Sequence, residues 1–211
     1  MKRRLCLLLA LWPMASWAGG ADGTALPELL ARIRQSGPAQ FHYEETRRLE
    51  LAAAPWHGEG YMLSGADGSL VKLQLLPKRV IMAIVQDRMY YWDPEQRQRS
   101  SAPLSFAGSA AGQIAVFRAI LQGQAETLAP DYDFAADRQG KRWSLRVTPK
   151  PGQGGEEAPS VEISGDEDTN RRRIAISQPD GESTEYRMER TDEGQRLEYS
   201  IQRLLLEAAG E

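Results

Sequence analysis

The sequence predicts an α+β domain dominated by one curved antiparallel sheet. Short segments in which polar and apolar residues alternate follow one another at intervals of roughly ten residues, which is typical of an antiparallel meander. Three further stretches carry apolar residues at helical spacing, near each end and in the middle of the chain. We therefore predict about nine strands and three helices in a single domain.

The first helix is predicted over residues 24–35. Thr24 is a plausible N-cap, and four apolar residues share one helical face: Leu26, Leu29, Leu30 and Ile33. Gly37 and Pro38 then end the helix. The alternating segments that follow predict strands at residues 40–51, 56–63 and 70–75.

Val80–Pro94 carries the strongest strand signal in the chain. Two apolar runs, rich in β-branched and aromatic residues, flank a polar turn at residues 86–88, and the second run ends at Asp93-Pro94, a turn starter. The first run is apolar at every position, as in a strand covered on both faces. The sequence therefore leaves open which of its alternate residues face inward.

The period becomes helical at residues 109–122 and then returns to that of strands. Gly123 is placed to end the helix, whose apolar face is formed by Ile114, Phe117, Ile120 and Leu121. Further strands are expected at residues 132–136, 143–148, 161–163, 174–177 and 185–189. Residues 197–208 again place apolar side chains on one face, which favours a closing helix over a last strand.

The first 18 residues have the three parts of a secretory signal peptide. Three basic residues precede an apolar run at residues 5–12, and small residues lead to Ala18. The run is too short to cross ~30 Å of hydrocarbon, and Cys6 lies too early in it to be the lipid-modified cysteine of a lipoprotein. We predict a signal peptide at residues 1–18, cleaved after Ala18, and a single domain at residues 19–211.

The composition of the mature chain excludes several classes of site. Cleavage would leave 211 − 18 = 193 residues without cysteine, since Cys6 is the only one, so disulfides and thiolate chemistry are excluded. Loss of three basic residues leaves 26 − 3 = 23 basic against 29 acidic side chains, a formal charge of −6. A negative chain without a large basic face is a poor partner for nucleic acid or for anionic lipid surfaces.

Four segments together resemble the LolA family of periplasmic lipoprotein carriers. They are Phe41-His42-Tyr43-Glu44-Glu45, Gly58-Glu59-Gly60-Tyr61, Val85–Pro94, and Trp143-Ser144-Leu145-Arg146-Val147-Thr148-Pro149-Lys150. The third is similar to a V-x-D-G-x-x-x-W-x-Y-x-P strand pair of the family, and the fourth to its L-x-P-K strand. Their order and spacing carry the resemblance, which covers roughly residues 26–188.

The resemblance implies an incomplete β-barrel (LolA/LolB-like) whose apolar concave face is covered by helices and shelters acyl chains. Each methylene hidden from water is worth ~0.8 kcal/mol, so a modest cavity can hold such a chain. We expect the cavity to be lined by Tyr43, Tyr61, Leu63, Leu73, Leu75, Met82, Ile84, Tyr91, Leu145 and Val147, and by Phe117 and Leu121 from the middle helix. Alternating apolar residues are also the ordinary core pattern, so the same set can simply pack beneath the helices.

The sequence departs from the family at one functional position. Lipoprotein carriers have an arginine followed by proline near the start of the third strand, and that arginine helps to hold the lid closed. The corresponding place here is Gly65-Ala66-Asp67, and the nearby Lys72 is not a match. The cargo therefore stays open between a lipoprotein and another lipid, such as a glycolipid or an acylated or polyene lipid.

Enzyme and metal sites have weaker support. His42 shares strand parity with Glu44, a geometry that can pair an imidazole with a carboxylate but is more often an exposed strand face. Asp166, Asp168 and Asn170 imitate the start of a calcium loop, yet its sixth and twelfth positions are Arg171 and Ser177. Residues 171–173 are all arginine and can contact an anionic head group, or form a solvated strand start. We predict no catalytic activity, no metal and no cofactor.

The leading hypothesis is a soluble periplasmic carrier. It would shelter the acyl or other apolar part of a lipid or lipoprotein during transfer towards the outer membrane, and would work as a monomer between an inner-membrane donor and an outer-membrane acceptor protein. The alternative is a non-transporting lipid-sensing or accessory binding module of the same fold.

Overall fold

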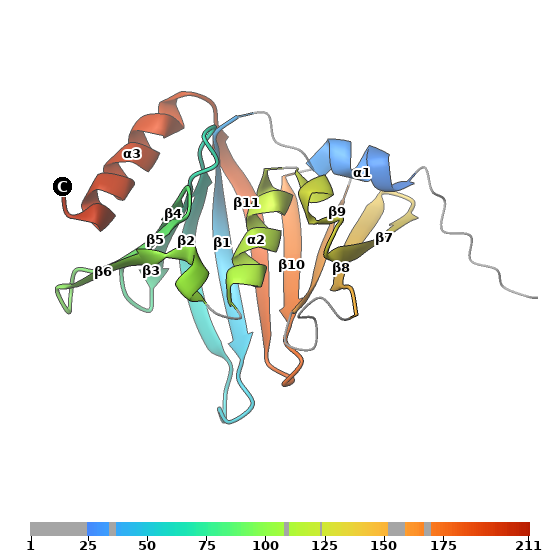
Figure 1. Cartoon of the computed structure of the whole chain (residues 1–211), viewed down its shortest axis with the longest axis horizontal. Coiled ribbons are helices and arrows are strands. Elements are labelled where there is room, and N and C mark those ends of the chain that lie inside the picture. Colours follow the sequence, from blue (N-terminus) through green and yellow to red (C-terminus); the bar gives the residue numbers. More distant parts are fainter. Residues whose placement is uncertain (1–24, 34–36, 108–109, 123, 152–158, 167–169) are drawn as a thin grey trace, which may run out of the picture.

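The computed structural model describes residues 25–33, 37–107, 110–122, 124–151, 159–166 and 170–211. Within them, eleven strands form one antiparallel sheet in the order β6-β5-β4-β3-β2-β1-β11-β10-β9-β8-β7 (Figure 1). The edge strands β6 and β7 are not paired with each other, so the described sheet is open. This confirms the predicted fold class, an α+β domain built on an incomplete barrel. The predicted signal peptide lies outside the described residues.

The sheet consists of two meanders joined along one strand pair. The first contains β1 (Ala39–Arg48), β2 (Trp56–Ser64), β3 (Leu70–Leu76), β4 (Val80–Val85), β5 (Arg88–Asp93) and β6 (Gln98–Pro103). The second contains β7 (Tyr132–Gln139), β8 (Arg142–Pro149), β9 (Ser160–Asp166), β10 (Arg171–Ser177) and β11 (Ser183–Glu193). They join where β1 pairs with β11, from Ala39 opposite Glu193 to Arg48 opposite Ser183.

Helical segments connect the meanders and cover the two faces of the sheet. They are α1 (Ala25–Ile33), α2 (Ala110–Leu121), α3 (Arg196–Ala209) and the short 3₁₀ segments η1 (Leu104–Ala107) and η2 (Ala125–Leu128). The chain leaves one edge of the sheet at β6 and enters the other edge at β7, and α2 lies on this crossover, against the face of the sheet that is nearer in Figure 1. We call the face that α1 and α2 cover the inner face, and the opposite one the outer face.

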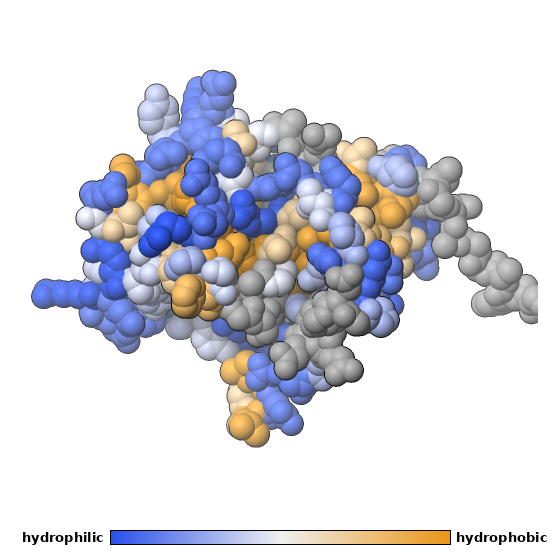
Figure 2. All heavy atoms as spheres, viewed as in Figure 1, coloured by the Kyte–Doolittle hydropathy of each residue, from blue (hydrophilic) through white to orange (hydrophobic). Residues whose placement is uncertain are grey.

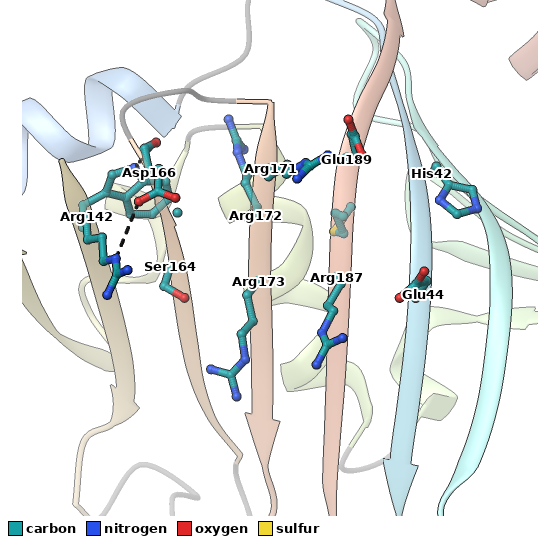
Figure 3. A pocket seen from close by; sticks show the side chains of 13 residues that line it. His42, Glu44, Arg142, Ser164, Asp166, Arg171, Arg172, Arg173, Arg187 and Glu189 are labelled. Carbon is teal, nitrogen blue, oxygen red and sulfur yellow. Dashed lines mark hydrogen bonds and ion pairs between the residues drawn. The ribbon is translucent and has the colours of Figure 1, made fainter.

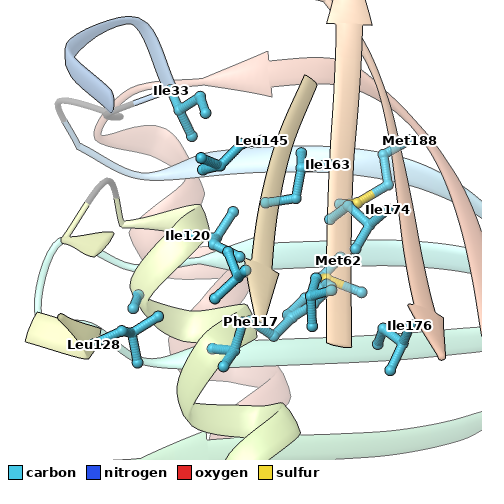
Figure 4. Close-up of a cluster of buried hydrophobic side chains, with 14 of the residues drawn as sticks. Ile33, Met62, Phe117, Ile120, Leu128, Leu145, Ile163, Ile174, Ile176 and Met188 are labelled. Carbon is cyan, nitrogen blue, oxygen red and sulfur yellow. The ribbon is translucent and has the colours of Figure 1, made fainter. Parts of the chain in front are cut away.

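The inner face carries the larger hydrophobic core. Leu29 and Ile33 of α1 and Val116 and Ile120 of α2 are buried in one cluster with side chains from β1 to β3 and from β7 to β11. Figure 4 shows several of these side chains converging between α2 and the sheet. Because one cluster receives residues from β3 on one side and from β7 on the other, the sheet curves around it.

The outer face has a second core beneath α3. Leu197, Ile201, Leu204 and Ala208 of this helix are buried against a set of strand residues: Leu63, Val71, Ile81 and Ala83. The spacing of the helix residues is the one that predicted a closing helix, and that prediction is confirmed. The placement was not predicted, because α3 covers the outer face while α1 and α2 cover the inner one.

Other element predictions differ in detail from the structure. The helices expected at 24–35 and 109–122 are confirmed over 25–33 and 110–121. Strand β6 was not predicted, because its Gln-Arg-Ser-Ser run has no apolar alternation and forms an exposed edge. Gly60 of β2 has a packing reason that its sequence context did not reveal: a Cβ there would lie 2.0 Å from the carbonyl oxygen of Leu73 on β3.

Candidate functional site: an apolar cavity on the inner face

An apolar cavity of about 470 Å³ lies between α2 and the inner face of the first meander. Its wall comes from eight strands of the sheet, β1 to β6 with β10 and β11, and from α2. The described residues that line it are mainly apolar: Arg47, Met62, Leu70, Lys72, Met82, Ala83, Ile84, Met89, Tyr90, Tyr91, Ser100, Ser101, Ala102, Ile114, Phe117, Ile176 and Tyr186. Figure 2 shows apolar residues gathered in a band across the middle of this side of the molecule, with polar residues around it.

Three methionines give the cavity wall an adaptable surface. Met62, Met82 and Met89 come from three different strands, and each is unbranched with a polarisable thioether. Phe117 of α2 lies opposite them and packs its ring 5.7 Å from that of Tyr186. Such a wall accepts elongated apolar groups without a fixed shape requirement.

Strand β4 shows how the sequence makes both a core and a cavity. Ile81 and Ala83 are buried beneath α3 on the outer face, although Ala83 also borders the cavity. Met82 and Ile84 alternate with them and line the cavity on the inner face. A strand covered on both sides is therefore apolar at every position, and the parity that the sequence left open is now assigned.

The expected cavity residues fall into four groups in the structure. Met82, Ile84, Tyr91 and Phe117 line the cavity. Tyr43, Leu145 and Val147 are buried in the inner core and do not line it. Tyr61, Leu63 and Leu73 lie on the outer face against α3, and Leu75 is 41% exposed. Leu121 belongs to α2, but its side chain lies outside the described part of the chain.

A buried ionic cluster forms one end of the cavity. Glu45 has a fully buried carboxylate, which accepts hydrogen bonds from Arg47 Nε at 2.5 Å, from Tyr186 at 2.9 Å and from Lys72 Nζ. The Lys72 side chain is only 13% exposed, and its ammonium group lies 3.4 Å from the Tyr186 hydroxyl and 5.1 Å from the centre of the Tyr43 ring. The cluster therefore brings two cations to one carboxylate.

The environment of this cluster shifts the pKa of each buried group. Burial raises the pKa of Glu45, but the charges and hydrogen bonds of Lys72 and Arg47 outweigh it and hold that pKa below its ordinary value. Burial lowers the pKa of Lys72, although Glu45 opposes the shift. Burial and the neighbouring Glu45 raise the pKa of Tyr43, whose hydroxyl has no hydrogen-bond partner among the described residues.

Two hydrogen bonds attach the cavity helix α2 to hairpin turns of the sheet. Arg118 Nη1 donates to the carbonyl oxygen of Gln86, in the β4–β5 turn, at 2.8 Å. Gln122 Nε2 donates to the carbonyl oxygen of Gly68, in the β2–β3 turn, at 2.9 Å. These two contacts hold α2, which covers the cavity, against the turns of the sheet.

The outer face of the second meander is polar and has a different character. A shallow concavity of about 580 Å³ crosses β1, β11, β10, β9 and β8 (Figure 3). Its exposed arginines are paired with acids, as in Arg171 with Glu189 at 3.4 Å and Arg173 with Glu185 at 2.8 Å, whereas Arg172 is buried. This arrangement is that of a solvated strand face rather than a free basic site.

The candidate enzyme and metal residues also lie on exposed surfaces. His42 Nε2 contacts Glu59 Oε1 of β2 at 2.9 Å, and both side chains are partly exposed. Asp166 lies 3.9 Å from Arg142, and the middle of the calcium-like loop falls outside the described residues. In the described part of the chain no group of three His, Cys, Asp or Glu side chains could hold a metal ion. No helix there is both long and apolar enough to span a bilayer.

One buried cation lies apart from the cavity. Arg172 of β10 is 4% exposed, and its Nε and Nη1 have no hydrogen-bond partner in the described part of the chain. Its guanidinium group lies 5.8 Å from the centre of the Phe41 ring. Burial, with a contribution from the charge of Arg190, lowers its pKa to about 10.

Comparison with known proteins gives matches among solved structures alone. No protein-family model matches the sequence, and no curated protein sequence matches it. A LolA superfamily protein from Nitrosomonas europaea is 12% identical, covers 82% of this chain and 96% of its own, and has a TM-score of 0.41. A DUF1329 family protein from Desulfovibrio piger is 12% identical over 77% of this chain and 88% of its own, with a TM-score of 0.42.

MucB is a third structure of this kind, 18% identical over 84% of this chain, with a TM-score of 0.43. The chain spans 60% of the length of MucB. These matches are likenesses of fold between chains of low identity. At such identities they add nothing on the cargo or the partners of this chain.

Proposed function

We propose that the protein is a periplasmic carrier that holds the acyl or other apolar part of a lipid or lipoprotein in the inner-face cavity. The observation that carries the proposal is the cavity itself, about 470 Å³ with a wall dominated by methionine, isoleucine and aromatic side chains. Burial of an acyl chain there would contribute ~0.8 kcal/mol for each methylene removed from water. The methionines suit a cargo that must be bound loosely enough to be released.

The proposal includes export and hand-over. Residues 1–18 would direct the chain to the periplasm and be cleaved, and residues 19–211 would act as a soluble monomer between an inner-membrane donor and an outer-membrane acceptor. The cargo is a lipoprotein or another lipid, because the arginine that closes the lid in lipoprotein carriers has no counterpart at residues 65–67. No chemical transformation of the cargo is involved.

Binding of an uncharged fluorescent probe tests the cavity directly. The purified mature protein is titrated with N-phenylnaphthylamine, and native extracts are analysed by mass spectrometry for bound lipid. We expect Ile84→Glu to abolish probe binding while the protein stays folded, because this side chain lines the cavity. Leu75→Glu is the matched control: Leu75 is 41% exposed on β3 and does not line the cavity, so its replacement should leave the affinity unchanged.

Absence of bound lipid together with absence of probe binding would refute a lipid-binding function. A second measurement separates a carrier from a sensor. A carrier should accelerate transfer of a fluorescent phospholipid between donor and acceptor vesicles in proportion to its concentration. A protein that binds the probe without increasing this transfer rate is a binding module, and the carrier role would then be wrong.

A further inference from the structure

The cluster of Glu45, Arg47 and Lys72 at the end of the cavity has an excess of one positive charge. Arg47 and Lys72 contribute two positive charges, and Glu45 contributes one negative charge, which leaves one positive charge. None of the described residues that line the cavity is acidic. The Arg47 side chain is 40% exposed, so water screens part of the excess charge, but Lys72 is only 13% exposed, and a poorly solvated cation beside an apolar cavity favours an anionic partner.

Lys72 also has a hydrogen-bond donor to spare. Its ammonium group carries three N–H donors, and the described residues accept two of them, at Glu45 and at Tyr186. The side chain is only 13% exposed and lines the cavity, so the remaining donor belongs to an ammonium group with little access to water. A hydrogen bond to an ionised oxygen there would be stronger than one at the protein surface.

The rest of the cavity has the shape for a long apolar tail. Its lining runs from Arg47 on β1 through β2, β3, β4 and β5 to Ala102 on β6. Five steps between neighbouring strands, at about 4.8 Å each, give a path of roughly 24 Å along the sheet. The two serines of the lining, Ser100 and Ser101, lie on β6, at the other end of this path from the charged cluster.

We propose that the cavity binds a singly charged amphiphile, with its carboxylate at Lys72 and Arg47 and its apolar tail along β2 to β6. This proposal rests on the proposed lipid-binding function and adds the chemistry of the head group. A carboxylate supplies the one negative charge that the cluster lacks, and it leaves the Glu45 contacts in place. The cavity therefore selects acids over uncharged lipids of the same chain.

A pair of probes that differ only in head charge tests this selection. Cis-parinaric acid and its methyl ester share one fluorescent chain, and at about pH 8 the acid is ionised. We expect the full chain without its signal peptide to bind the acid about 10-fold more tightly than the ester, the effect of one charge-assisted hydrogen bond. Lys72→Met should reduce this ratio to about one while ester binding persists.

Tyr43→Phe is the matched control. The variant removes the buried hydroxyl of Tyr43, which lies beside the same cluster. This hydroxyl has no hydrogen-bond partner among the described residues, and Tyr43 does not line the cavity, so the ratio of the two affinities should stay unchanged. If Lys72→Met does not fold, Arg47→Gln replaces it: the Arg47 side chain is 40% exposed, and the ratio should fall about 3-fold.

Each contrary outcome identifies what is wrong. Equal affinity for acid and ester in the unmodified protein would overturn the head-group proposal and leave the proposed function standing. A ratio that survives Lys72→Met and Arg47→Gln would do the same. If a lysophosphatidic acid of equal chain length displaces the acid and binds more tightly than it does, the preferred head group is a phosphate and the carboxylate is refuted. If neither probe binds, the proposed lipid-binding function itself fails.

Discussion

Strand β4 separates two regions that use the same strands and are filled differently. On the outer face, Ile81 and Ala83 are buried beneath α3, in contact with its fully apolar stripe. On the inner face, Met82 and Ile84 border a cavity of about 470 Å³ beneath α2. Adjacent residues of β4 therefore pack closely on one side of the sheet and border an unfilled space on the other.

The two faces of β4 should contribute differently to stability and to the proposed binding. Close packing removes apolar surface from water and leaves few voids, whereas a cavity forfeits contacts that its lining would otherwise make. The inner face further contains buried charges, each of which is costly unless it is paired. We infer that around β4 the outer face contributes close packing, whereas the inner face, which carries the larger core further along the sheet, leaves a space there for the proposed ligand.

Truncation on the two faces of β4 should have effects of unequal size. Ile81→Ala should lower the free energy of unfolding by about 3 kcal/mol, because a fully buried side chain leaves a cavity that cannot collapse. Met82→Ala should lower it by only about 1 kcal/mol, because Met82 already borders an empty space. Urea denaturation measures both values, and probe titration should show weaker binding for Met82→Ala alone.

Equal losses of stability in the two variants would contradict the comparison. So would a loss of probe affinity in Ile81→Ala under conditions where that variant is folded. Either result would mean that the two faces are coupled through the strand rather than divided by it.

The spacing of apolar residues was sufficient to predict the α+β class, the three α-helices and every described strand except β6. It was not sufficient to assign their faces, since Tyr61, Leu63 and Leu73 were expected in the cavity and lie beneath α3. Both faces of this part of the sheet are covered by helices, so both parities are apolar and the pattern is the same whichever residue faces inward. The position of α3 decides the faces, and that is a tertiary contact.

The charged cluster had a local signal that the sequence-based prediction did not use. Glu45 shares strand parity with Phe41 and Tyr43, so an alternating pattern already placed a carboxylate on the buried side of β1. Lys72 is the one charged residue in the apolar run of β3. A charge at a core position implies a buried partner, but the pairing across β2 became visible only in the sheet order.

Removal of the Glu45 carboxylate should lower the stability of the protein, because the inner face contains buried charges. Glu45→Gln leaves Lys72 and Arg47 without their counter-charge, and we expect a loss of about 2 kcal/mol in the free energy of unfolding at about pH 7. The pKa of Glu45 is lowered in the folded state, so its contribution is present above the ordinary value of 4.5 and is lost as the pH falls through the lower folded value. The difference between the two proteins should therefore shrink under acid conditions.

Glu44→Gln is the control for this titration. Its side chain is exposed on the outer face of the same strand, and the change should alter stability by less than about 0.5 kcal/mol at any of these pH values. A Glu45→Gln variant as stable as the unmodified protein at neutral pH would show that the cluster is not stabilised by its carboxylate.

The smallest expected effect concerns how the two covering helices are held. Arg118→Ala removes the hydrogen bond from α2 to the carbonyl oxygen of Gln86. Arg79→Ala removes the bidentate ion pair between the β3–β4 turn and Glu207 of α3, whose two N–O distances are 2.6 and 2.9 Å. Both contacts are partly exposed, so each variant should lose at most about 1 kcal/mol of stability. Only Arg118→Ala should change binding kinetics, with an increase of about 3-fold in the probe dissociation rate measured by stopped-flow fluorescence, since α2 covers the cavity. An equal increase of the dissociation rate in Arg79→Ala would mean that probe release requires loosening of the whole sheet. The two faces would then differ in packing but not in their effect on binding kinetics.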